Sequence, residues 1–302
     1  MKKNDVLTIL GVLFIGIAPF LIFSQPESPA KETVNQAAQQ NEDKDTEDAA
    51  DEPEDEEETN EDTTSGIESE EPVTQLQVFL NQAVHRTIDF FTNKEASITA
   101  IGDSLTQGVG DDVVEDGYVG ILDNQINKNT QVVSFENYGK RGNRSDQLLE
   151  RLDQPEIAQS IDHADMVLIT IGANDIMQVV KENVTNLRLE NFTPAKRAYK
   201  DRLQQIFDKL TNMNPDTEIY LVGVYNPFLN YFADIEELDM IVDDWNQTSR
   251  DVADQYENVT FIPIADLFES GDYELFADDH FHPSHRGYQL LAKRVLDYLT
   301  DS

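Results

Sequence analysis

The chain has 302 residues, enough for one large domain or two small ones, and its formal net charge is −37. This strong negative charge argues against nucleic acid and anionic lipid headgroups as docking partners. There is no cysteine, which excludes disulfides, a thiol nucleophile and a lipid-modified cysteine.

The N-terminus has the pattern of a membrane segment. Lys2 and Lys3 precede an apolar run over residues 6–23, close to the ~18–20 residues that cross a bilayer. We predict an uncleaved transmembrane anchor within residues 1–25, because the run is long for a signal core and a poor cleavage site follows it. A cleaved signal peptide is the alternative. The two lysines favour the cytoplasmic side of the membrane, so the rest of the chain is expected outside the cell membrane. If the segment is cleaved, the protein is expected to be secreted.

Residues 26–72 read as an acidic, disordered linker. Between Glu27 and Glu71 there are nineteen acidic residues against two lysines, and almost no aromatic or branched apolar side chains. Such a segment repels itself and has no means of forming a core. Residues 73–302 are apolar enough for one globular domain. It begins with a predicted amphipathic helix over residues 73–95, in which His85 is read as a surface or packing residue.

Short apolar segments alternate with helical patterns through the rest of this domain. The strand candidates are residues 97–101, 131–135, 165–171, 218–224 and 259–262. The helical patterns cover residues 118–128, 145–151, 194–212, 234–256 and 285–299. Strands separated by helices indicate an α/β fold with a parallel sheet and crossover helices on both faces.

Active residues of such folds gather where the strands end. Ser104 follows the first strand candidate, within the stretch "AIGDSLTQGVGDD". A serine hydroxyl needs a base to become a nucleophile, and the base needs a third group to orient it. The segment "DDHFHPSH" supplies both, since Asp279 and His282 lie three residues apart in one turn. Gly142, Asn174 and the N–H of Ser104 can donate hydrogen bonds to an oxyanion.

Four blocks of this sequence together resemble a known family. "GDSLTQG" at 102–108, Gly142, "GAND" at 172–175 and "DDHFHPS" at 278–284 are similar to the blocks of the SGNH hydrolases, also called the GDSL esterase/lipase family. The resemblance spans roughly residues 96–300. Within the family, the chain most resembles the lysophospholipase L1 and thioesterase I type, in the Gram-positive form with an N-terminal membrane segment.

The resemblance implies a three-layer α/β/α sandwich with a five-stranded parallel sheet, flavodoxin-like, and a serine esterase that needs no metal or other cofactor. Ser104 would be the nucleophile, His282 the base and Asp279 the group that orients it. Ser104, Gly142 and Asn174 would form the oxyanion hole. We expect a monomer that cleaves acyl or acetyl esters of lipids or of cell-wall carbohydrates.

Two other functions remain open at this point. A non-catalytic surface module that binds carbohydrate or lipid would keep the fold without the chemistry, although it would have no use for the complete set of blocks. A metal-dependent hydrolase could use His280 and His285, which lie in the same histidine-rich segment. The block spacing favours His282 instead.

Several residues have both a functional and a packing interpretation. Lys140, Arg141 and Arg144 could line the cleft and favour an anionic or phosphate-bearing ester, or they could pair with the many carboxylates of the domain. His163 is read as a surface residue and Trp245 as a packing residue. Tyr118 and Tyr225 could line a pocket or be buried in the sandwich.

Overall fold

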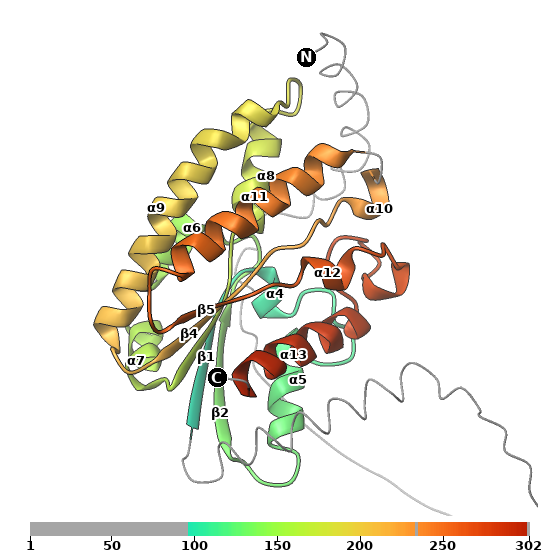
Figure 1. Cartoon of the computed structure of the whole chain (residues 1–302). Coiled ribbons are helices and arrows are strands. Elements are labelled where there is room, and N and C mark those ends of the chain that lie inside the picture. The colour runs from blue at the N-terminus through green and yellow to red at the C-terminus, as the bar shows by residue number, and fades with distance from the viewer. Residues whose placement is uncertain (1–95, 233–234, 301–302) are drawn as a thin grey trace, which may run out of the picture.

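The computed structural model describes residues 96–232 and 235–300 (Figure 1). The predicted anchor, the linker and the leading helix over 73–95 lie outside these residues. None of the helices within the described ranges is both long and apolar enough to cross a bilayer.

One sheet of five parallel strands forms the centre of the domain, in the order β2-β1-β3-β4-β5. The strands are β1 (Ala96–Gly102), β2 (Val133–Gly139), β3 (Met166–Thr170), β4 (Glu218–Val222) and β5 (Val259–Ile262). Side chains alternate between the two faces, as the strand geometry requires. In β3, Val167 and Ile169 belong to one core and Met166 and Leu168 to the other.

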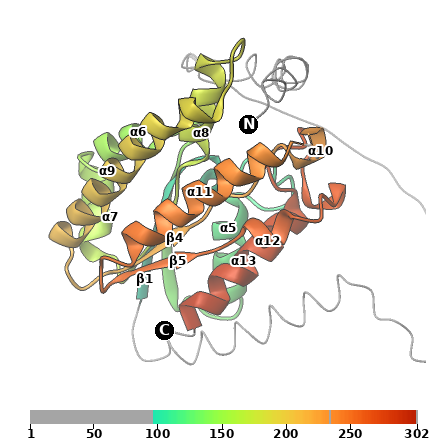
Figure 2. The ribbon, with the colours of Figure 1, turned by 45° about the horizontal axis from the view of Figure 1, so that its top comes forward.

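Helices cover both faces, so the fold has three layers (Figures 1 and 2). The first core receives apolar side chains from α6 (Ser145–Arg151), α7 (Pro155–His163), α8 (Ala173–Glu182), α9 (Leu189–Met213) and α11 (Glu236–Ala253). The second receives them from α4 (Ser104–Gln107), α5 (Gly117–Ile126), α12 (Ala265–Phe268), η1 (Tyr273–Leu275) and α13 (His285–Thr300). The short α10 (Leu229–Phe232) lies between β4 and α11. The predicted α/β/α sandwich with a five-stranded parallel sheet is therefore confirmed.

The second strand differs most from its predicted bounds, 131–135. It runs from Val133 to Gly139 and pairs with β1 alone, at the edge of the sheet. Its polar residues have partners there: Asn137 donates to Thr106 O at 2.7 Å and accepts from Gly139 N at 2.8 Å. An edge strand keeps a solvated side, so it lacks the continuous apolar run by which buried strands are found.

Among the described helices longer than one turn, α7 and α8 were not predicted, and α9 starts earlier than predicted. The short helices α4, α10, α12 and η1 were not predicted either. α7 has Pro155 at its first turn, and α8 directly follows Gly172, whose φ of +117° suits glycine. α9 begins at Leu189, five residues before the predicted start at residue 194. Trp245 of α11 is buried and packs against Phe192 and Tyr199, as its packing interpretation predicts.

Candidate active site

Ser104 stands at the first position of α4, directly after β1. The preceding Asp103 is buried and caps the helix, since its Oδ1 accepts a hydrogen bond from Leu105 N at 3.0 Å. The same oxygen accepts a hydrogen bond from Thr170 Oγ1 at 2.8 Å. Gly102 makes this turn possible, because a Cβ there would lie 2.2 Å from Thr170 O. The serine hydroxyl is thereby held at the carboxyl edge of the sheet, near its centre.

His282 and Asp279 reach Ser104 from the loop before α13. His282 Nε2 lies 3.0 Å from Ser104 Oγ, and His282 Nδ1 lies 2.6 Å from Asp279 Oδ2. Asp279 Oδ1 also accepts from the backbone amides of His282 at 2.9 Å and Phe281 at 3.0 Å. The structure thus brings together the three side chains that the sequence pointed to, although 175 or more positions separate Ser104 from the other two.

The electrostatics of Asp279 and His282 fit a histidine base that is oriented by a carboxylate. Partial burial of Asp279 opposes its charge, but the hydrogen bond to the His282 ring, the electrostatic attraction of that ring when it is protonated, and the backbone amides of His282 and Phe281 outweigh burial. Together they lower the pKa of this carboxyl from 3.8 to about 2. The ionised Asp279 accepts from Nδ1 and leaves Nε2 free to accept a proton from Ser104. His282 itself is 2% exposed, which shields the pair from water.

The loop that carries this pair is anchored by aromatic hydroxyls. Tyr225 OH donates to Phe281 O at 2.7 Å and Tyr231 OH to Asp279 O at 3.0 Å. Tyr225 is almost completely buried, so it serves the sandwich and the loop together. Tyr118 is also buried, with its hydroxyl 3.4 Å from Thr106 Oγ1.

The two predicted oxyanion donors outside the serine come from adjacent loops. Gly142 follows β2, has a φ of +77°, and has nothing within 4 Å of the position that a Cβ would occupy. Asn174 lies in the first turn of α8, and its Nδ2 donates to Asn143 O at 3.1 Å. That bond uses one of the two amide hydrogens, so a second is left for a ligand.

A buried network that the sequence did not reveal joins these two loops. Asp175 accepts from Ser145 N at 3.0 Å and Ser145 Oγ at 2.6 Å. Arg202 of α9 donates to Asp175 Oδ1 at 2.9 Å and to Ser145 Oγ at 2.7 Å. Burial nevertheless raises the pKa of Asp175 above its ordinary value. Arg202 carried no signal in the sequence, because it lies in none of the four blocks and reaches Asp175 only through the packing of α9.

A second carboxylate–imidazole pair backs the catalytic loop. His285 Nδ1 lies 3.0 Å from Asp111 Oδ1, and the Asp111 side chain has no exposed surface. The neighbouring Gly110 packs so closely that a Cβ would lie 2.7 Å from Pro283 O and 2.9 Å from His282 Cβ. The segment after Ser104 is therefore fixed against His282. The short spacing of Gly108 and Gly110 was the only sequence signal of this contact.

Within the described ranges, His163, His280 and His285 belong to no cluster of side chains placed to hold a metal ion. Across residues 96–232 and 235–300 no group of three or more His, Asp or Glu side chains is placed as ligands of one ion would be. His280 contacts the rings of Tyr231 and Tyr273. His163 is exposed and bonds to Gln159 O within its own helix, as a surface residue does.

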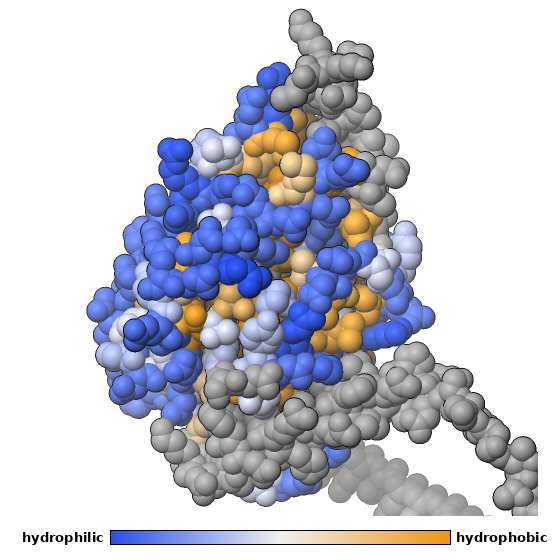
Figure 3. Space-filling model, in the orientation of Figure 1, coloured by the Kyte–Doolittle hydropathy of each residue, from blue (hydrophilic) through white to orange (hydrophobic). Residues whose placement is uncertain are grey.

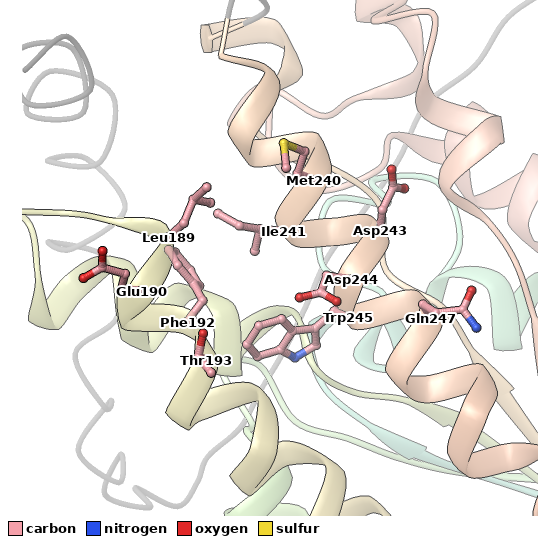
Figure 4. Close-up of a pocket in the computed structure, with 10 residues that line it drawn as sticks. All are labelled: Leu189, Glu190, Phe192, Thr193, Met240, Ile241, Asp243, Asp244, Trp245 and Gln247. Carbon is pink, nitrogen blue, oxygen red and sulfur yellow. The ribbon is translucent and has the colours of Figure 1, made fainter. Parts of the chain in front are cut away.

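Two pockets of similar volume lie beside the helices α6, α9 and α11. One, of about 680 Å³, includes Gly142 in its lining and extends along α6. The other, of about 670 Å³, lies between α9 and α11 (Figure 4), has acidic and apolar walls, and shares no residue with the four blocks. Hydrophobic residues show between the helices near α8 and α11 on a face that is otherwise mostly hydrophilic (Figure 3).

The comparisons with known proteins agree with this geometry. The sequence profile of the GDSL-like lipase/acylhydrolase family matches residues 100–290. The chain belongs to this family, and it is an enzyme of the carboxylic ester hydrolase class. That assignment sets aside the non-catalytic binding module.

Two relatives and two solved structures are similar to this chain. The uncharacterized protein YpmR of Bacillus subtilis is 37% identical over 208 residues, which cover 68% of this chain and 81% of that protein. The spore germination lipase LipC of Bacillus licheniformis is 28% identical and covers 65% of this chain and 93% of its own length. A lipase from a goat rumen metagenome has a TM-score of 0.59 at 24% identity, over 68% of this chain and 97% of its own. An acetylxylan esterase from Geobacillus stearothermophilus has a TM-score of 0.52 at 20% identity, and the match covers 68% of this chain and 94% of the esterase. The latter two show the fold.

Proposed function

We propose that the chain cleaves carboxylic esters through an acyl-enzyme on Ser104. The observation that carries the proposal is the row Asp279–His282–Ser104, with contacts of 2.6 and 3.0 Å. His282 takes the proton of Ser104 Oγ as that oxygen bonds to the ester carbonyl carbon. His282 then gives the proton to the leaving alcohol, and the C–O bond of the ester breaks. Water, activated by the same histidine, releases the acid and restores the serine.

The negative charge of the tetrahedral intermediate needs preorganised donors. The N–H of Ser104, the N–H of Gly142 and the side-chain amide of Asn174 are proposed to supply them. Two features support this assignment. Gly142 has no side chain to cover its amide, and Asn174 and Asn143 are linked by a hydrogen bond that sets the spacing of the two loops.

The proposed substrates are acyl or acetyl esters of lipids or of cell-wall carbohydrates. The two classes need the same chemistry and differ in the length of the acyl group. One similar protein is named a lipase and another an acetylxylan esterase, so the comparisons support both classes. Chain length is therefore the property to measure.

The proposal includes the location of the enzyme. Lys2, Lys3 and the apolar run over residues 6–23 support a single-pass anchor with the catalytic domain outside, and residues 26–72 would serve as the spacer. Fractionation of cells and protease treatment of intact protoplasts test this. Protected protein or protein in the soluble fraction of the cell would contradict the anchor.

The expected monomer is tested by light scattering of the purified chain.

The activity is tested with p-nitrophenyl esters from two to sixteen carbons and the full chain in detergent. We expect turnover with one optimum of chain length, and no turnover by Ser104→Ala at any length. His282→Ala should lose nearly as much, whereas His280→Ala should lose little, since it is the matched histidine two positions away. Equal losses at both histidines would contradict the choice of base.

A further inference from the structure

Two cations immediately precede the proposed oxyanion donor Gly142. Lys140 and Arg141 are exposed, and neither side chain has a hydrogen-bond or ion-pair partner in the part of the chain that the structure describes. Arg144 differs, because its Nη2 lies 2.9 Å and its Nε 3.1 Å from the carboxylate of Asp146. Pairing with the acids of the domain therefore explains Arg144 and leaves the other two cations without a structural role.

The backbone of both cations is tied to the turn that carries Ser104. Lys140 N donates to Gly102 O at 3.0 Å, and Arg141 N donates to Gln107 Oε1 at 2.5 Å. Gly139 permits this approach, because a Cβ there would lie 2.1 Å from Gln107 N. These contacts fix the backbone of Lys140 and Arg141, from which the two side chains project, beside the turn that carries Ser104.

The same cations line a groove that includes the oxyanion loop. The groove of about 680 Å³ contains Lys140, Arg141, Gly142 and Asn143 and continues to the end of α6. Its two carboxylates are Glu150 and Asp153, and Asp153 Oδ1 is paired with Lys209 Nζ at 2.5 Å. Arg151 also lines the groove, and its guanidinium donates to Asn143 Oδ1 and Tyr138 O. Cations outnumber the unpaired acid here, in a chain whose net charge is −37.

We propose that Lys140 and Arg141 form a subsite for a phosphate or phosphodiester group of the ester substrate. The inference rests on the proposed function, because the carbonyl carbon is placed at Ser104 and its oxygen at Gly142. Neighbouring Cα atoms are about 3.8 Å apart, so both cations begin within two residue spacings of the oxyanion donor. A phosphate a few bonds from the ester lies within their reach. An arginine fork beside a lysine suits phosphate oxygens, and the acidic surface elsewhere repels such a substrate.

The test uses two esters that differ in the phosphate alone, 1-butyrylglycerol and 1-butyrylglycerol 3-phosphate. The measured quantity is the ratio of kcat/KM for the phosphate ester to that for the neutral ester. We expect Lys140→Gln/Arg141→Gln to lower this ratio about tenfold, about threefold for each exposed charge, and added salt to lower it in the wild type. The swap Lys140→Arg/Arg141→Lys should keep most of it. The control Lys128→Gln, an exposed lysine just before β2, should keep the wild-type ratio.

An unchanged ratio in the double glutamine variant overturns the subsite. Equal slowing of both esters also overturns it, since that result indicates general damage to the oxyanion loop. Failure of the proposed function gives a different result, namely no turnover of either ester by the wild type or turnover that survives Ser104→Ala.

The phosphate could belong to a lipid headgroup or to a soluble polyol phosphate of the wall. 1-Oleoylglycerol 3-phosphate and 1-oleoylglycerol in mixed micelles form the long-chain pair of the same experiment. A preference for phosphate at both chain lengths supports the subsite with a soluble phosphate ester. A preference in the long-chain pair alone supports it with a lipid headgroup, provided that the double variant abolishes the preference.

Discussion

Asp175 fixes Ser145 through both its backbone amide and its hydroxyl, at 3.0 and 2.6 Å. Asp175 follows the proposed oxyanion donor Asn174, and Ser145 lies three residues after Gly142. The relationship therefore sets the distance between two donors that come from different strand ends. Arg202 completes it from the long helix α9.

Arg202→Ala should destabilise the domain and slow catalysis. The Asp175 carboxylate is 2% exposed and would lose its cation. Removing one partner of a buried ion pair costs about 3–5 kcal/mol, and because Arg202 is 27% exposed we expect the lower end, about 3 kcal/mol. Urea unfolding measures this loss. The control is Arg197→Ala, an exposed arginine on the same helix, which should change stability by less than about 0.5 kcal/mol. Equal midpoints for the two variants would contradict the role of Arg202.

Gly110→Ala should reduce activity through His282. The φ of Gly110 is +101°, and the added Cβ would lie 2.9 Å from His282 Cβ. We expect a loss of about 1–3 kcal/mol of stability and a fall in kcat larger than any rise in KM, since the base moves relative to Ser104. Asp112→Ala, an exposed substitution in the same loop, is the control. Wild-type kcat in the glycine variant would show that the loop does not position the base.

Asp103→Asn should change how stability depends on pH. Burial raises the pKa of Asp103 from 3.8 to about 7, against the hydrogen bonds from Thr170 and Leu105. The folded state thus holds a proton that the unfolded state releases, so the wild type loses stability as pH rises from about 4 to about 7. Each pKa unit corresponds to about 1.4 kcal/mol, and we expect a loss of roughly 2–4 kcal/mol. The neutral asparagine variant should lack this loss. Parallel urea midpoints of both proteins from pH 4 to 8 would contradict the raised pKa.

Asp279→Asn should leave a folded but slow enzyme. An amide at this position favours the wrong tautomer of His282, and we expect kcat to fall about 10³–10⁴-fold.

The pKa of Asp279 is lowered from 3.8 to about 2. The ionised carboxylate therefore contributes its full stabilisation above pH ~4 and loses it as pH falls toward 2. The stability difference between wild type and variant should therefore vanish at the acid end. A difference that persists at pH 2 would show that the charge of Asp279 is not its source.

The sequence predicted the buried parts of this fold better than its edges. β3 and β5 are short apolar runs and were placed within one or two residues, and α6 was placed at its observed bounds. β2 was displaced because only Val133 of its seven residues is buried, so the strand has no continuous apolar run. The helix α8 was taken for a loop, since its N-terminus is the block that contains Asn174.

Local blocks identified the groups of the proposed chemistry, and contacts across the fold remained hidden. Ser104 and His282 each lie in a motif at a strand end or in the last loop. Arg202 and the pair Asp111–His285 depend on packing between distant elements. The spacing within one segment does not identify the distant partner in such a contact, so a single sequence cannot specify the pair.

The most direct test of the account is to trap the acyl group. The full chain in detergent is mixed with p-nitrophenyl butyrate, quenched in acid within milliseconds, digested and examined by mass spectrometry, with Ser104→Ala alongside. The account predicts a butyryl group on Ser104, a burst of p-nitrophenol equal to the amount of enzyme, and neither in the variant. Turnover of the ester with no acyl group on Ser104, or undiminished turnover by Ser104→Ala, would contradict it.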